Sequence, residues 1–103
     1  MTSFDHEKQM VLQICQTLLE KGYLKSTEGN VSVRVNAQPF FAITPSSYDY
    51  ALMKSSDICV LDFNLKQKEG ERKPSIESAM HASVYQNRAD VNVIIHTHQP
   101  YAS

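Results

Sequence analysis

The strongest constraint on the fold comes from residues 74–98, where a helical pattern is followed at once by a strand pattern. The nearly continuous apolar run at residues 91–95 predicts a strand from the interior of a sheet. His96 and His98 follow it. Because strand side chains alternate between faces, both point the same way, with Cα atoms about 6.5 Å apart. Two imidazoles at that separation can bind one divalent ion, so the segment predicts a candidate metal site.

Glu77 lies near the start of the helix expected over residues 76–87, and it is a candidate third ligand or acid–base group. A short polar turn joins this helix to the strand, so the ends that hold Glu77 and His98 can come together. Plainer readings stay open for each residue alone. A His-x-His pair can be two polar residues at a strand end, and Glu77 with His81 can be a local i,i+4 pair. Only the combination of three potential ligands favours a metal site.

Apolar spacing predicts the remaining elements. A first helix is expected over residues 4–21, with Ser3 as its N-cap and Gly22 as its stop. Strands are expected at residues 31–35, 40–44 and 58–63, with 65–68 pairing back onto the last. The first strand should be half-buried, since its valines alternate with Ser32, Arg34 and Asn36. The expected core faces of the two helices are Val11, Leu12, Cys15, Leu18 and Leu19 in the first, and Ile76, Ala79, Met80 and Val84 in the second.

Several small and hydroxyl side chains mark candidate anion-binding loops. Gly29 and Asn30 both tolerate positive φ, so a simple tight turn is the plain reading there. The alternative is a backbone cradle for an anion, because glycine lets a phosphate approach amide groups closely. Ser46, Ser47 and Ser75 add hydroxyls at a turn and at a helix start, where they can cap a helix or donate to a phosphate.

Composition bounds the class of protein. The 103 residues are enough for one small domain, and the net charge of −1 comes with no basic stripe for nucleic acid or for an anionic membrane. The apolar runs are too short for a membrane span, and the polar N-terminus is unlike a secretory signal. Cys15 and Cys59 match no zinc or redox spacing, which is typical of buried, reduced thiols in a cytoplasmic protein.

Five segments in order resemble the class II aldolase and adducin family: EGNVSVRV (28–35), FAITPSSYDY (41–50), DICVLDF (57–63), ERKPSIESAMH (71–81) and ADVNVIIHTHQPYA (89–102). The resemblance implies an α/β fold, an α/β/α sandwich around a central, largely antiparallel sheet. In the family's enzymes a glutamate and three histidines serve a divalent metal, usually Zn²⁺, and Glu77, His96 and His98 match three of these four. The third histidine would lie beyond Ser103. The chain, residues 1–103, is therefore expected to be the N-terminal portion of a single such domain, apparently truncated.

The resemblance also implies a function. Family enzymes cleave a carbon–carbon bond of a sugar phosphate through a metal-stabilised enediolate, with Glu77 here as the catalytic group. The phosphate would be held by Gly29, Asn30, Ser46, Ser47 and Ser75, although the family often has glycine at Ser47. A homotetramer is expected for the full-length protein, with active sites at subunit interfaces. The alternatives are a sugar-phosphate 4-epimerase, an adducin-like assembly domain without catalysis, and an inactive fragment.

Overall fold

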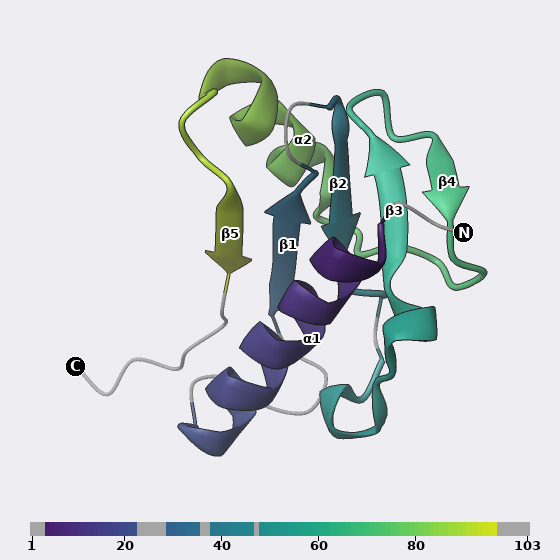
Figure 1. Cartoon of the computed structure of the whole chain (residues 1–103), viewed down its shortest axis with the longest axis vertical. Coiled ribbons are helices and arrows are strands. Elements are labelled where there is room, and N and C mark those ends of the chain that lie inside the picture. Colours follow the sequence, from purple (N-terminus) through teal and green to yellow (C-terminus); the bar gives the residue numbers. More distant parts are fainter. Residues whose placement is uncertain (1–3, 23–28, 36–37, 47, 97–103) are drawn as a thin grey trace.

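The computed structural model describes residues 4–22, 29–35, 38–46 and 48–96. These form a five-stranded antiparallel sheet in the order β4-β3-β2-β1-β5, with one helix against each face (Figure 1). The elements are α1 (Asp5–Glu20), β1 (Asn30–Arg34), β2 (Phe40–Ile43), β3 (Cys59–Asp62), β4 (Gln67–Glu69), α2 (Ser78–Asn87) and β5 (Val93–His96), with 3-10 turns at Tyr50–Leu52 and Ser55–Asp57. The expected α/β/α sandwich around an antiparallel sheet is confirmed.

The first helix follows its sequence pattern closely. Within α1, Val11 and Cys15 are fully buried against the sheet, and the leucines of the expected face pack around them. The N-cap position is occupied by Phe4, which makes no side-chain capping bond, while the expected cap Ser3 lies outside the described residues. Gly22, at a φ of 78°, follows the end of the helix as expected.

The expectation of a half-buried β1 is wrong. Val31 and Val33 pack on the α1 side, but Ser32 is also fully buried, on the opposite face of the strand. The reason is that α2 covers that face, so β1 has no solvent side at Ser32. A serine can be buried there because its hydroxyl is hydrogen-bonded to two side chains of α2.

The predicted buried face of α2 is also wrong. The helix begins at Ser78 instead of Ile76, and it buries Ser78, His81, Ala82 and Tyr85. The apolar stripe expected in the core faces outward, with Ile76 82% and Met80 37% exposed. The face that packs on the sheet carries polar groups whose hydrogen bonds are satisfied inside the protein, and a rule based on apolar spacing does not detect such a face.

The last strand lies at an edge of the sheet. Among the described strands, β5 pairs only with β1, in an antiparallel register that sets Val31 opposite Ile95 and Val33 opposite Val93. Ile95 therefore faces the α1 side, where it is 48% exposed. The sequence indicated an interior strand, and the described part of the sheet does not provide the second neighbour that such a strand requires.

Two further expectations concern the chain as a whole. Cys15 and Cys59 are both buried free thiols, as predicted. Among the described residues, neither helix combines the length and the apolar character that a membrane crossing demands.

Candidate functional site

The candidate site lies where several strand ends meet. β1 begins at Asn30 while its antiparallel neighbours β2 and β5 end at Ile43 and His96, so these three strand ends lie together at one end of the sheet. We call this place the site end of the sheet, and the segment that leads into α2 reaches it too. Ser75 donates its backbone N–H to the carbonyl of Thr44 at 3.1 Å, beside a bridge between Pro45 and Pro74.

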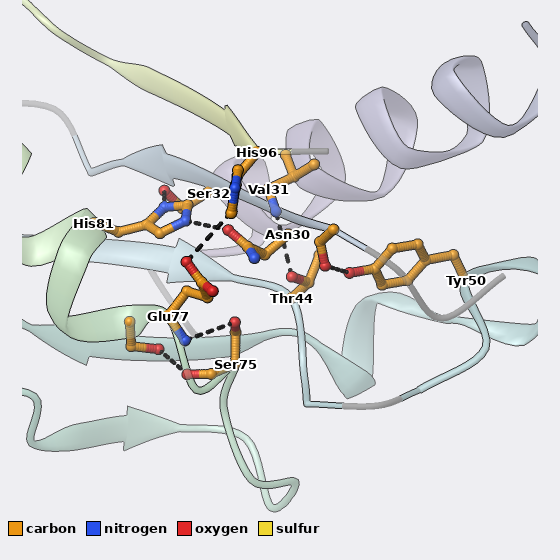
Figure 2. Close-up of polar contacts among 11 residues, drawn as sticks. Asn30, Val31, Ser32, Thr44, Tyr50, Ser75, Glu77, His81 and His96 are labelled. Carbon is orange, nitrogen blue, oxygen red and sulfur yellow. Dashed lines mark hydrogen bonds and ion pairs between the residues drawn. The ribbon is translucent and has the colours of Figure 1, made fainter. Parts of the chain in front are cut away.

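Glu77 and His96 face each other at the site end of the sheet. Glu77 Oε1 lies 3.3 Å from His96 Nδ1, with 31% and 38% of the two side chains exposed (Figure 2). Glu77 occupies the N-cap position of α2, and its backbone N–H donates to Ser75 Oγ at 3.1 Å. This contact holds the turn from which the carboxylate projects.

A carboxylate oxygen and an imidazole nitrogen are a donor set that suits Zn²⁺ or a similar divalent ion. The two groups are partly exposed and adjacent, so they fit such an ion as two of its ligands. His98, the other predicted ligand, lies outside the described residues. Within the part of the chain that the structure describes, no three ligand-type side chains gather closely enough to form a complete metal site.

The structure brings some of the predicted phosphate-binding residues to the site end of the sheet. Gly29 has a φ of 88°, a backbone conformation that favours glycine, and Asn30 next to it is 2% exposed. Ser75 is nearly buried below Glu77 (Figure 2). Ser46 lies one residue beyond the proline bridge and donates its backbone N–H to the carbonyl of Lys73 at 2.8 Å. Ser47 lies outside the described residues.

Two residues that the sequence did not single out hold the glycine loop in place. The backbone of Val31 donates to Thr44 Oγ1 at 3.3 Å, and the Tyr50 hydroxyl donates to the carbonyl of Gly29 (Figure 2). Burial raises the pKa of Tyr50 to about 12, so this hydroxyl remains a donor at neutral pH. The start of β1 is thus fixed from two sides.

A buried chain of hydrogen bonds runs behind Asn30. The Tyr85 hydroxyl lies 2.7 Å from Ser32 Oγ, which lies 2.6 Å from His81 Nδ1, and His81 Nε2 contacts Asn30 Oδ1. Burial, and next the charge of nearby His96, lower the pKa of His81 to about 4, so its imidazole is neutral at neutral pH.

The sequence hypothesis treated His81 only as a helical neighbour of Glu77, yet its imidazole bonds to β1. The signal was present in the sequence. Glu77, His81 and Tyr85 recur at intervals of four, which places three polar-tipped side chains along one side of a helix. Pairing that stripe with Ser32 required knowing which sheet face the helix covers.

Comparison with known proteins identifies the relatives of this chain. A family model described as "Class II Aldolase and Adducin N-terminal domain" matches residues 9–103. A 5-deoxy-D-ribulose 1-phosphate aldolase of Bacillus thuringiensis serovar kurstaki is 38% identical over 96 residues, covering 93% of this chain and 45% of that protein. An L-fuculose phosphate aldolase of Methanococcus maripaludis is 34% identical over 92 residues, covering 89% of this chain and 49% of that protein.

Solved structures give the same picture. An L-fuculose 1-phosphate aldolase superposes with a TM-score of 0.88 at 42% identity, covering 99% of this chain and 47% of that one. The L-fuculose-1-phosphate aldolase of Thermus thermophilus gives a TM-score of 0.71 at 27% identity, covering 89% of this chain and 46% of that one. The chain therefore spans about half the length of the curated relatives and solved structures that it matches.

Proposed function

Because the chain belongs to the class II aldolase and adducin family, we propose that it supplies the N-terminal part of a metal-dependent aldolase acting on a sugar phosphate. The observation that carries the proposal is the Glu77–His96 pair, 3.3 Å apart at the site end of the sheet, where Asn30 and Ser75 also lie. The relatives named as aldolases of 5-deoxy-D-ribulose 1-phosphate and L-fuculose phosphate support this substrate class.

The metal would be held by Glu77 and His96 together with His98, and Zn²⁺ or another divalent ion suits these donors. When bound, such an ion supplies Lewis-acid stabilisation of the negative charge that develops as the carbon–carbon bond beside a carbonyl breaks. Two histidines and one glutamate leave the ion without the third imidazole found in the family's enzymes. We therefore expect weak metal binding and little turnover from residues 1–103 alone.

The chain's own residues would orient the substrate and move a proton. Among the described residues, Glu77 is the only one that has a carboxylate beside His96, so it would carry the proton to or from the reacting carbon. Binding energy from a phosphate remote from that carbon would hold the substrate in register. The groups proposed for the phosphate are Gly29, Asn30, Ser46, Ser47 and Ser75.

The metal site is tested by zinc titration of residues 1–103 followed by NMR and calorimetry. His96→Ala should weaken zinc binding by at least about tenfold, because it removes one of the proposed ligands. His6→Ala is the matched control, since His6 is exposed on α1 and should leave zinc affinity unchanged. Equal zinc affinity in wild type and His96→Ala would contradict the site.

The reaction is tested with fuculose 1-phosphate and 5-deoxyribulose 1-phosphate, using this chain beside a longer chain that carries the same residues. Cleavage should yield an aldehyde and a shorter keto phosphate, and Glu77→Gln should lower the rate in the longer chain. A product with its carbon chain intact and one centre inverted would favour the 4-epimerase instead. Equal turnover by the short and long chains would show that the third imidazole is not needed.

A further inference from the structure

Among the described residues of the candidate site, Asn30 is the one with a buried side-chain amide, and the orientation of that amide decides what it offers a ligand. The side chain is 2% exposed, and one end of its carboxamide contacts His81 Nε2. The other end is turned away from His81, toward the side where Glu77 and Ser75 lie (Figure 2). Within the described part of the chain, that second end makes no other hydrogen bond. A nitrogen there would present a donor, and an oxygen would present an acceptor.

Counting hydrogens settles which atom faces His81. The buried chain from Tyr85 to Asn30 has three contacts, and Tyr85, Ser32 and neutral His81 bring three hydrogens to them. If Asn30 presents its oxygen to His81, each contact takes one hydrogen and all three donors are satisfied. If Asn30 presented its NH₂ group instead, one buried hydroxyl hydrogen would have no acceptor in the chain, which is costly in a protein interior.

The only arrangement that satisfies every donor has a fixed direction. The Tyr85 hydroxyl donates to Ser32 Oγ, the Ser32 hydroxyl donates to His81 Nδ1, and His81 Nε2–H donates to Asn30 Oδ1. His81 is then in the Nε2–H tautomer, set by its contact with Ser32. The Asn30 NH₂ group then points away from His81, at the site end of the sheet, and is available as a donor.

We propose that His81 is a positioning residue that, through Asn30 Oδ1, turns the Asn30 NH₂ group outward to donate to the phosphate of the substrate. The inference rests on the proposed sugar-phosphate function and adds a residue behind the site that does not itself touch substrate. Its chemistry discriminates by charge. A flipped Asn30 would present an oxygen where the NH₂ group now lies, and an acceptor there would repel an anion that a donor attracts.

The direction of the chain is tested without any ligand. Long-range ¹H–¹⁵N NMR of the imidazoles in residues 1–103 reports which ring nitrogen carries the hydrogen, and His81→Gln assigns the signal. The expected result is a neutral His81 with hydrogen on Nε2 and none on Nδ1. A His81 with hydrogen on Nδ1 would overturn the proposal, because Asn30 would then have to present its NH₂ group inward.

The consequence for binding is tested by titrating inorganic phosphate and following the Asn30 side-chain NH₂ and Gly29 N–H resonances. His81→Leu, which has no donor, should weaken phosphate binding by about tenfold, the worth of one hydrogen bond. His81→Gln, whose amide can still donate to Asn30 Oδ1, should restore most of the affinity. Ile43→Val is the matched control for lost packing, since Ile43 is fully buried in the core on the same face of the sheet.

The outcomes separate the two proposals. Equal phosphate affinity in wild type and His81→Leu would overturn the role of His81 and leave the phosphate site standing. Equal losses in His81→Leu, His81→Gln and Ile43→Val would also overturn it, because the effect would then be one of general stability. Wild-type protein that shows no phosphate shift at Gly29 and Asn30 would overturn the phosphate site itself, and with it the role of His81.

Discussion

The buried imidazole of His81 links the protonation of one residue to the stability of the fold. Its pKa is lowered to about 4, first by burial and then by the charge of His96, from an ordinary value of 6.5. The unfolded chain therefore takes up a proton at a pH where the folded chain does not. The stabilisation is complete above about pH 6.5 and is lost as the pH falls from there toward 4.

We expect the free energy of unfolding to fall by about 2 kcal/mol between pH 7 and pH 5 on account of His81 alone. Urea denaturation of wild type and His81→Gln at both pH values measures this, since carboxylates that titrate in both proteins cancel in the difference. Glutamine does not titrate, so the variant should lack this part of the loss. A fall of the same size in both proteins would show that His81 is not the group responsible.

The sequence identified individual site residues better than it identified their partners. Glu77 and His96 were singled out by residue type and by position at the ends of a helix and a strand, and they lie 3.3 Å apart. Ser32 and His81 were not paired, because strand alternation alone assigns Ser32 to solvent. Ser32 is buried because α2 packs over that face, and there its hydroxyl both accepts and donates a hydrogen bond in the buried chain from Tyr85 to Asn30.

At the scale of elements, the order along the chain was predictable and the packing of α2 was not. Turn residues and apolar runs located both helices and the strands to within a few residues, because those signals are local. The buried face of α2 depends on long-range complementarity with β1 and β2. Ala82 and Tyr85 pack there against Phe41 and Ile43, while Ile76 stays exposed.

Arg34 fastens the turn between α2 and β5 to the end of β1. Its guanidinium donates to the carbonyls of Val91, Tyr85 and Arg88 at 2.9, 2.8 and 2.9 Å. It also lies 4.8 Å from the ring centroid of Tyr85 and 5.5 Å from that of Phe63. A planar fork with several donors is needed to satisfy three carbonyls and stack on rings, and a lysine ammonium cannot reproduce it.

Arg34→Lys should therefore lower the free energy of unfolding by about 2 kcal/mol and speed amide exchange in the turn after α2. Arg88→Lys is the control, because the side chains of Arg88 and its partner Asp90 are 63% and 69% exposed, and it should leave the urea midpoint nearly unchanged. Urea midpoints and hydrogen exchange give both values. Indistinguishable midpoints for the two variants would show that Arg34 does not hold the turn.

For the whole molecule, the governing feature is that the described residues cover the strands of the sheet unequally, with β5 paired on one side only. Two cores, one on each face, bury the strands from β1 to β3. At β5 the described residues offer no second strand, and Val93 and Ile95 are 38% and 48% exposed on the α1 side. An edge with unpaired backbone groups and apolar side chains is a template for pairing with another strand.

We expect residues 1–103 to self-associate through this edge, with a sedimentation coefficient that rises with protein concentration. Ile95→Lys should reduce the association, because a charge on an edge strand opposes strand pairing and removes apolar contact area. Leu52→Lys removes a side chain that is 65% exposed in the Tyr50–Leu52 turn, away from β5, and should sediment like wild type. If both lysine variants disperse the oligomers equally, association is driven by general surface hydrophobicity and not by β5. If wild type stays monomeric at every concentration, the β5 edge does not mediate association.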